Sequence, residues 1–454
     1  MRIRASSVNG RRTRLCAVIA VGMILFSSPD LLCQVDPAIQ RMVDSISLPL
    51  MQQRIAILER AGGHYSRVNF TPGNDSAAII LKQSFDAIPG LTSVVYDTFY
   101  IASAGPGLNT KAMVNIVATL QGKGDASRIF VAGAHFDCSG SRMGSSWTSQ
   151  WQTMSVPGAD DNATGLAIIL ELARIMSDPF FGYSPDATVK FIAFGAEESG
   201  PAYSGSHHGS KHFAGAALTS SANIIGMVSI DMVGYNPLHL YQSIITNASS
   251  TSLAIRFADA AGSYAFPLLT STLNNSSATY SDHDSFWNDG YPAICLIENA
   301  PPWNSNSYYQ ANPFYHTSSD SSGTVNMELV RKVARMSLAA ISTFAGEPVG
   351  VKDVALNVKP SGYRLEQNYP NPFNPTTVIS FQLPVSSWVK LAVYDVLGRV
   401  VATLVDERVA TGAHTVGFDG SRLVSGTYFC RLAAAPAGGG SGVFLQTMRM
   451  LLVK

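Results

Sequence analysis

The chain has 454 residues, of which 46% are hydrophobic and 14% charged, and its 31 basic residues balance its 31 acidic ones. This length predicts about two to four domains with a sizeable core. A net charge of zero excludes a global electrostatic field that would recruit nucleic acid or an anionic membrane, so we expect no nucleic-acid partner and a substrate that is selected locally.

The first 34 residues predict a secretory signal peptide. Five arginines precede the apolar run Leu15 to Phe26, which is shorter than the ~20 residues that a membrane span needs. We therefore expect residues 1–34 to be removed, leaving a mature chain without a transmembrane segment. A twin-arginine signal at Arg11-Arg12 and lipoprotein processing at Cys33 are the alternatives. The five cysteines are spread singly, so no disulfide framework is visible and burial should supply the stability.

The segment before residue 345 predicts an α/β fold. Residues 37–90 have helical periodicity, and the strands predicted at 93–101, 112–120 and 128–134 suggest an antiparallel start to a sheet. Helix and strand then alternate, with helices at 163–176, 205–214, 252–261 and 326–344 and strands at 187–195, 224–231 and 293–297. Such alternation predicts a mixed, mostly parallel central sheet flanked by helices.

The C-terminal fifth of the chain has a different pattern. Turn residues separate short strands predicted at 377–383, 389–394, 400–405, 412–418, 426–432 and 443–452, which is typical of a small all-β sandwich. The expected organisation is a signal peptide at 1–34, a catalytic domain at 35–346, a linker at 347–361 and a β-sandwich domain at 362–454.

Acidic and imidazole side chains follow the predicted strands at their carboxyl ends, where ligand chemistry gathers in open α/β sheets. His135 and Asp137 share one face of an extended segment, because strand side chains alternate. His135 can bind a metal through one ring nitrogen while Asp137 accepts a hydrogen bond from the N–H of the other, which fixes the orientation of the ring. Taken alone, the pair is as compatible with a structural histidine beside a turn-forming aspartate.

Asp160 and Asp161 lie in a turn with Gly and Pro just before a predicted helix. An aspartate has two oxygens, so a single one can bridge two cations. Helix capping is the structural alternative, although Asn162 or Thr164 could cap the helix equally well.

Four further residues, at three places in the chain, complete the set. Glu197 and Glu198 are adjacent at a strand end, so their side chains point in different directions. One of them can bind metal while the other acts as a general base. A solvated turn that carries both is the alternative. Asp231 ends another apolar strand, and metal coordination would remove the penalty of burying it. His316 lies in a late loop, where a lone histidine is usually a surface residue.

These motifs, in this order, resemble the zinc aminopeptidases of peptidase family M28. The resemblance rests on His135-Phe-Asp137, Pro157 to Gly165, Gly195 to Glu198, Ser229 to Met232 and Tyr315-His316-Thr317, and it covers about residues 128–344. It implies two zinc ions bridged by Asp160. His135 and Asp231 would complete one site, and Glu198 and His316 the other. Glu197 would be the general base, Asp137 would orient His135, and the peptide bond between Asp160 and Asp161 would be cis.

The activity that this resemblance implies is that of a secreted zinc metallopeptidase. It would remove N-terminal residues from peptides with a metal-bridged hydroxide and Glu197 as the base. A carboxypeptidase, a dipeptidase or a glutaminyl cyclase on the same fold, and a non-catalytic binding ectodomain, are the alternatives. The intact acidic set argues against the ectodomain, since its charges would repel one another without metal. Candidate walls of an apolar specificity pocket are Met232, Tyr235, Tyr280, Phe286, Tyr308 and Tyr309.

The C-terminal segment carries a second resemblance. Glu366 to Thr377, Val393 to Arg399 and Leu423 to Phe429 are similar to the C-terminal sorting domain of type IX secretion cargo. This implies the type IX machinery as a partner, export through the periplasm and a secreted or cell-surface location. A carbohydrate- or protein-binding accessory domain is the alternative. The Ala- and Gly-rich stretch 433–442 departs from the pattern as an insertion before the last strand.

Overall fold

The computed structural model describes residues 35–299, 304–306, 308–346, 362–365, 368, 371–409, 412–437 and 443–453. The predicted signal peptide at 1–34 and linker at 347–361 lie outside the described residues, so the domain limits drawn from them stay predictions. None of the helices in the described ranges is long and apolar enough to cross a membrane. Within the same ranges, Cys138, Cys295 and Cys430 are buried free thiols.

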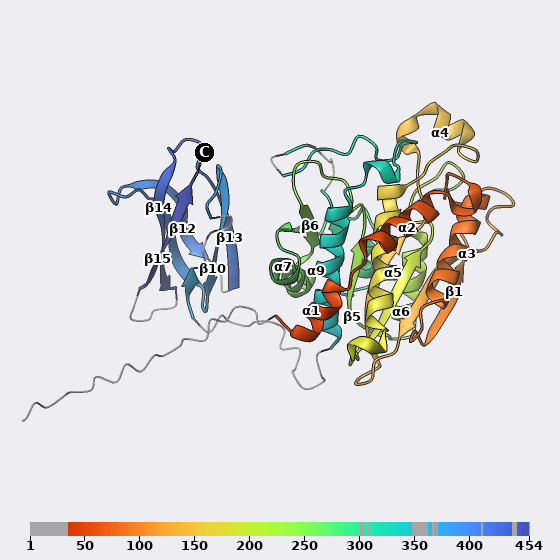
Figure 1. The fold of residues 1–454 in the computed structure, drawn as a ribbon, viewed down its shortest axis with the longest axis horizontal. Helices are drawn as coiled ribbons and strands as arrows, with labels where there is room; N and C mark the ends of the chain where they lie inside the picture. Colours follow the sequence, from red (N-terminus) through yellow and green to blue (C-terminus); the bar gives the residue numbers. More distant parts are fainter. Residues whose placement is uncertain are drawn as a thin grey trace, which may run out of the picture.

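An eight-stranded sheet organises the larger part of the chain (Figure 1). Its order is β1-β2-β4-β3-β5-β8-β6-β7. Parallel pairs join β3 to β4 and β5, β5 to β8, and β6 to β7, whereas β1–β2, β2–β4 and β6–β8 are antiparallel. The predicted mixed, mostly parallel sheet is thus confirmed. The strands are β1 (Ser93–Phe99), β2 (Met113–Leu120), β3 (Arg128–His135), β4 (Thr188–Phe194), β5 (Asn223–Ile230), β6 (Tyr241–Thr246), β7 (Leu269–Asn274) and β8 (Ala293–Ile297).

Two features of the sheet differ from expectation. β1 and β2 are antiparallel neighbours, but β4 lies between β2 and β3, so the predicted antiparallel start does not extend to β3. Strand order depends on crossovers that a local pattern does not encode. Neither β6 nor β7 is among the predicted strands. β7 is a mostly exposed edge strand, and its Ser and Thr residues hide the usual alternation of polar and apolar side chains.

Helices cover both faces of the sheet. Residues of α2, α3, α5, α7 and α9 form the larger core with one face, and residues of α6 and α8 form a smaller core with the other. β3 shows the division, since Phe130, Ala132 and Ala134 join the larger core and Val131 the smaller one. The helices are α1 (Pro37–Asp44), α2 (Leu48–Glu59), α3 (Pro72–Asp86), α4 (Ser145–Gln150), α5 (Thr164–Met176), α6 (His208–Thr219), α7 (Thr251–Tyr264), α8 (His283–Asn288) and α9 (Met327–Ala345).

The C-terminal segment is all antiparallel β structure, as predicted. One sheet has the order β13-β10-β9 and the other β12-β11-β14-β15, and side chains of both form one hydrophobic core. Residues 433–436 of the predicted insertion belong to β14, while residues 438–442 lie outside the described part. The strands are β9 (Arg364–Leu365), β10 (Thr376–Leu383), β11 (Ser387–Tyr394), β12 (Val400–Val409), β13 (Gly412–Asp419), β14 (Gly426–Pro436) and β15 (Phe444–Leu452).

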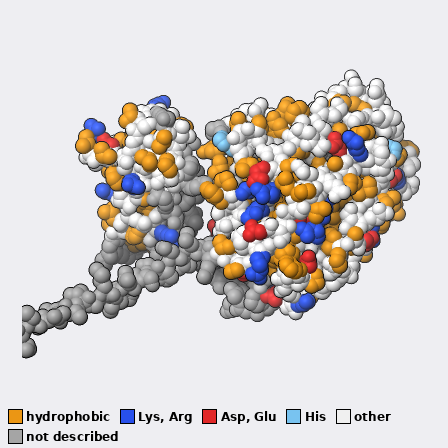
Figure 2. Space-filling model, in the orientation of Figure 1, with side chains coloured by type: hydrophobic (Ala, Val, Ile, Leu, Met, Phe, Trp, Pro, Cys, Tyr) orange, Lys and Arg blue, Asp and Glu red, His pale blue; other side chains and the backbone are white. Residues whose placement is uncertain are grey.

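Charged side chains are distributed in small mixed groups on the face of the molecule that Figure 2 displays. Acidic and basic residues alternate there with apolar and neutral ones, so this face carries no extended patch of one sign. This face therefore offers no extended surface that would select a ligand by the sign of its charge.

Candidate metal centre

The carboxyl ends of three neighbouring strands bring the predicted site residues together. His135 ends β3, Glu197 and Glu198 follow β4, and Asp231 follows β5. β3 lies between β4 and β5 in the sheet, so these three ends converge on one edge. The turn before α5 adds Asp160 and Asp161, and the loop before α9 adds His316.

Two sets of three donor atoms form at this edge. His135 Nε2 lies 3.2 Å from Asp161 Oδ1 and 3.3 Å from Asp231 Oδ1. His316 Nε2 lies 3.0 Å from Asp161 Oδ2 and 2.7 Å from Glu198 Oε1. Within each set the donor atoms lie within 4.8 Å of one another, and all five residues are buried. Asp161 belongs to both sets and faces each imidazole with a different oxygen.

Asp160, which we expected at this position, points elsewhere. Its Oδ1 accepts a hydrogen bond from the Gly234 backbone N–H (2.7 Å), and its Oδ2 accepts one from Asn312 Nδ2 (3.0 Å). Both carboxylate oxygens are therefore engaged away from the imidazoles, and neither set contains Asp160. The expectation that Asp160 is the shared carboxylate is wrong by one residue, and the cis peptide bond likewise joins Asp161 to Asn162 rather than Asp160 to Asp161.

The turn holds Asp161 through its neighbours. Asn162 Oδ1 accepts the Gly165 backbone N–H (3.0 Å), so Asn162 supplies the helix-capping contact that was the alternative role for the two aspartates. Asp320, buried in the loop that follows His316, accepts the backbone N–H groups of Asp160 (2.9 Å) and Asp161 (3.0 Å). Sequence reasoning gave Asp320 no role, since a lone loop acid four residues after His316 has no distinguishing signal.

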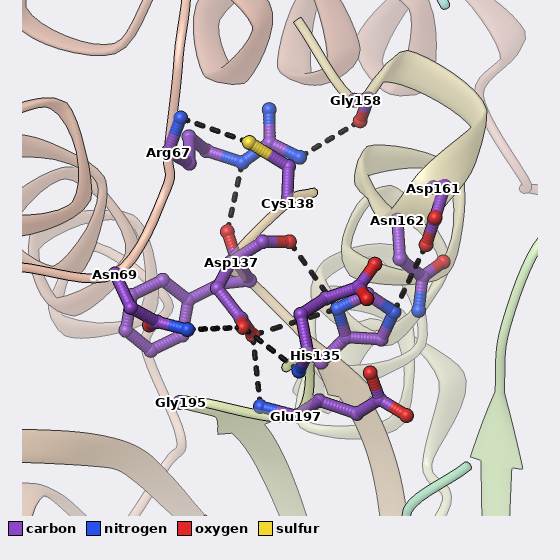
Figure 3. Close-up of polar contacts among 12 residues, drawn as sticks. Arg67, Asn69, His135, Asp137, Cys138, Gly158, Asp161, Asn162, Gly195 and Glu197 are labelled. Carbon is purple, nitrogen blue, oxygen red and sulfur yellow. Dashed lines mark hydrogen bonds and ion pairs between the residues drawn. The ribbon is translucent and has the colours of Figure 1, made fainter. Parts of the chain in front are cut away.

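Asp137 links two of the strand ends (Figure 3). Its carboxylate accepts the backbone N–H groups of Glu197 (3.1 Å) and Glu198 (3.0 Å) and the side-chain amide of Asn69 (2.6 Å). His135 Nδ1 lies closer to the Asp137 backbone carbonyl (3.2 Å) than to the carboxylate (3.6 Å). Asp137 therefore does contact His135, but its carboxylate mainly holds the turn that carries the two glutamates.

A buried arginine supports the same loops and was not predicted. Arg67 is fully buried and donates to the backbone carbonyls of Phe136 (2.8 Å) and Gly158 (2.7 Å), as well as to those of Leu58 and Pro157 (Figure 3). The guanidinium thereby joins the segment after His135 to the segment before Asp161. Arg67 lies about seventy residues from the nearest motif in the sequence, so nothing local announces this role.

The donor atoms are arranged as a cation would require. Asp161 Oδ2 is buried and, although His316 Nε2 lies 3.0 Å away, it accepts no well-directed hydrogen bond among the described residues, which normally marks a place for an ion or water. The imidazole nitrogens lie 3.0 and 3.2 Å from Asp161, and His135 lies 3.3 Å from Asp231. These spacings match the separation of about 3.3 Å between two ligands that each lie ~2.0 Å from a tetrahedral zinc ion. Imidazole and carboxylate are also the ligand types that zinc takes in hydrolytic sites.

The electrostatics show how strongly the acids act on the imidazoles. Burial alone lowers the pKa of His316, but the carboxylates of Glu198 and Asp161 raise it to about 10. Burial raises the pKa of Glu198 well above its ordinary value. At His316 and Glu198, therefore, the protonated form is favoured, and a cation bound there would compete with that proton.

Comparisons with known proteins agree with this geometry. A family model described as peptidase family M28 matches residues 115–341, half of the 454 residues. The chain belongs to peptidase family M28. A second model, described as a secretion system C-terminal sorting domain, matches residues 367–437.

Relatives of this M28 chain include a probable zinc metalloprotease of Pyrenophora teres f. teres (strain 0-1), 32% identical over 211 residues, or 44% of this chain and 41% of that protein. The match thus spans less than half of that relative's length. Among solved structures, LapB from Legionella pneumophila has a TM-score of 0.55 at 20% identity, over 69% of this chain and 76% of that one. The LapA aminopeptidase of the same organism has a TM-score of 0.54 at 21% identity, over 68% and 75%. These likenesses show the fold.

The M28 site opens into a cleft of about 210 Å³. Both donor sets line it, together with Glu197 and His207. Of the predicted pocket walls, Met232 and Tyr280 line the cleft. Phe286 instead packs in the core beneath α6, and Tyr235, Tyr308 and Tyr309 are absent from the cleft's described lining. Tyr309 donates to the buried Glu298 (3.1 Å), so the Tyr308-Tyr309 segment supports the floor behind Asp160 rather than a specificity pocket.

Proposed function

We propose that this M28 chain is a secreted, dinuclear zinc aminopeptidase. The observation that carries the proposal is the carboxylate of Asp161, which faces His135 with one oxygen and His316 with the other. A carboxylate shared between two sets of zinc-type ligands is what a pair of cations needs. A single-metal site would require only one of the sets.

The ligand assignment follows from the two sets. His135 and Asp231 would hold one zinc ion, Glu198 and His316 would hold the other, and Asp161 would bridge them, in the place first expected of Asp160. Bound zinc supplies Lewis acidity, which lowers the pKa of a coordinated water toward ~7 and polarises a carbonyl group. Asp137 and Arg67 keep the ligands in place through the backbone contacts described above.

Glu197 is placed to act as the general base. Its side chain lines the cleft but belongs to neither donor set, and its backbone N–H is fixed by Asp137. It would accept a proton from the attacking water and return it to the amine that leaves when the peptide bond breaks. Such proton transfer typically contributes about 10²–10⁴-fold to the rate.

Removal of N-terminal residues is the reaction that the relatives favour. The curated relative is named a zinc metalloprotease, and LapA, which shares the fold, is named an aminopeptidase. The cleft is small and lined by acidic groups, which suits a short substrate end that carries a free, positively charged amine.

A substrate panel on the purified full chain tests this proposal. We expect hydrolysis of an aminoacyl p-nitroanilide, and its N-acetylated counterpart should not be cleaved. Metal analysis should find about two zinc ions per chain, with loss of activity on chelation and recovery on zinc addition. Cleavage of C-terminal residues, or cyclisation of an N-terminal glutamine without hydrolysis, would replace the proposal with a carboxypeptidase or a glutaminyl cyclase. Retention of zinc without turnover of any substrate would favour a binding ectodomain.

The C-terminal sandwich supports the export part of the proposal. Its match to a sorting domain implies delivery by a type IX system to the medium or the cell surface, by way of the periplasm. Fusing residues 362–454 behind a periplasmic reporter in a host with that system should move the reporter outside the cell. Reporter retained in the periplasm would favour an accessory binding domain.

A further inference from the structure

His207 lies against the proposed general base, outside every motif that the sequence singled out. We propose that His207 is a positioning residue that anchors one oxygen of Glu197 and leaves the other free to exchange a proton. This inference rests on the proposed function and adds a residue to its machinery. It follows from the contacts on the two sides of the imidazole and from the backbone that carries it.

On one side, the imidazole meets the base directly. His207 Nε2 lies 3.1 Å from Glu197 Oε1, and both side chains line the cleft. A carboxylate can only accept a hydrogen bond when it is ionised, so the tautomer that suits this contact is the one with hydrogen on Nε2. The His207 backbone N–H also donates to the Glu197 backbone carbonyl (2.7 Å). One residue thus holds both the main chain and the side chain of Glu197.

On the other side, the imidazole is enclosed but has no hydrogen-bonding partner. His207 is buried, and its Nδ1 has no hydrogen bond within the described part of the chain. The nearest acid there is Asp284, whose Oδ2 lies 3.8 Å from Nδ1, too far for a hydrogen bond. The one strong contact of the ring is therefore the one with Glu197.

The backbone of His207 is held in a conformation that side chains rarely adopt. Its φ of 58° lies in the left-handed region, which is unfavourable for a residue other than glycine. Three hydrogen bonds surround this point: His207 N–H to Glu197, His208 N–H to Ala196 (2.8 Å), and Gly209 N–H to Gly195 (3.0 Å). They tie the start of α6 to the turn that carries the base, and the strained backbone directs the imidazole toward Glu197.

Anchoring one oxygen has a chemical consequence. Glu197 adjoins Glu198, which belongs to a donor set, and an unrestrained Glu197 carboxylate could swing toward a cation and become a ligand. With Oε1 engaged by His207, Oε2 remains available for the reacting water. The imidazole would therefore separate the role of Glu197 from that of its neighbour.

Paired substitutions test the inference in the zinc-loaded full chain. His207→Leu removes the donor and keeps the bulk, whereas His207→Gln keeps an N–H donor. We expect His207→Leu to lower kcat about 10–100-fold with KM and zinc content within about twofold of wild type, and His207→Gln to recover most of that loss. In a Glu197→Gln background His207→Leu should cause no further loss, because the two residues act as a unit. An equal loss in that background, or a loss in KM or zinc content instead of kcat, would overturn the inference.

A spectroscopic measurement separates this inference from the peptidase assignment. In ¹⁵N-histidine-labelled protein, the Nε2–H signal that disappears in His207→Gln should be visible in wild type and should shift in Glu197→Gln. The result does not depend on any catalytic activity. A His207 signal that is unchanged by Glu197→Gln would refute the contact even in an active peptidase, whereas a shifted signal in a protein that cleaves no peptide would refute only the proposed function.

Discussion

Replacing Asp161 with asparagine changes one oxygen of the carboxylate that faces both imidazoles into an amide nitrogen. That nitrogen is a donor, so only one of the two sets can keep an oxygen from residue 161. If the chain binds two zinc ions as proposed, we expect at least one of them to be lost. The affinity for the remaining ion should fall by more than the roughly 10–100-fold that removal of an outer-shell partner causes, because a formal negative charge leaves both sites.

Asp160→Asn is the matched control, since it makes the same chemical change one residue away. In the wild type, Gly234 N–H and the Asn312 side-chain amide donate to the two oxygens of Asp160. In the variant, the new amide nitrogen would face one of these two donors. One donor would be left unsatisfied, at a cost of about 1–3 kcal/mol in the free energy of unfolding. Zinc content should remain close to wild type, because neither set contains Asp160.

The assay is metal analysis by mass spectrometry after gel filtration, combined with urea unfolding of both variants. The expected pattern is loss of zinc for Asp161→Asn and loss of stability with zinc retained for Asp160→Asn. The reverse pattern would show that Asp160 is the shared ligand, as first expected, and would refute the reasoning from the carboxylate directions.

Three further expectations concern the supports of the site and the rest of the fold. Arg67→Met should lower the free energy of unfolding by about 3 kcal/mol or more, because it removes the donor from the carbonyls of Phe136 and Pro157. A urea midpoint equal to wild type would contradict this. Asp137→Asn places an amide donor against the backbone N–H of Glu197 or Glu198. It should reduce the rate or the zinc affinity about 10–100-fold, with the affinity measured by titration against a competing chelator. If both the affinity and the rate were unchanged, Asp137 would not have the supporting role. Burial raises the pKa of Glu171, but its hydrogen bonds and ion pairs with Arg174 and Arg54 outweigh burial, so the pKa in the folded protein is lowered. The resulting stabilisation is fully present above the unfolded pKa of about 4.3, and it is lost as the pH falls through the lower folded pKa. Unfolding measured from pH 7 to pH 3 should show that loss in wild type and a flatter profile in Glu171→Gln.

Much of the site could be read from the sequence, because strand ends meet at one edge of a parallel sheet. His135, Glu198 and Asp231 each end or follow an apolar strand, and the donor sets contain all three. The choice between Asp160 and Asp161 could not be made in this way. The turn there is irregular, with Asp161 at φ −108° and Asn162 at φ −135°, so no period indicates which carboxylate faces the cleft.

The residues that sequence reasoning missed share a physical reason. Arg67, Asp320 and His207 act through contacts with segments between about 10 and 160 positions away. No acid flanks His207 in the sequence, and the acid it contacts lies ten residues earlier, across a turn. The strand order could not be predicted for a similar reason, because crossovers pair strands that are distant in the sequence. The strand β7 could not be predicted because its exposed, polar residues show no alternation.

The carboxylate of Asp137 connects two strand ends of the site and leaves other walls of the cleft outside that connection. Asp137 follows β3, contacts His135 through its backbone carbonyl, and accepts the backbone N–H groups of Glu197 and Glu198 after β4. These contacts hold the two strand ends of the site together. Thr279 and Tyr280 reach the cleft from the loop between β7 and α8, which the hydrogen bonds of the Asp137 carboxylate do not hold. Thr279 is exposed, whereas Tyr280 packs against the cluster that contains Met232, next to Asp231. Directed evolution of substrate preference should therefore find its tolerated mutations at Thr279 sooner than at Tyr280.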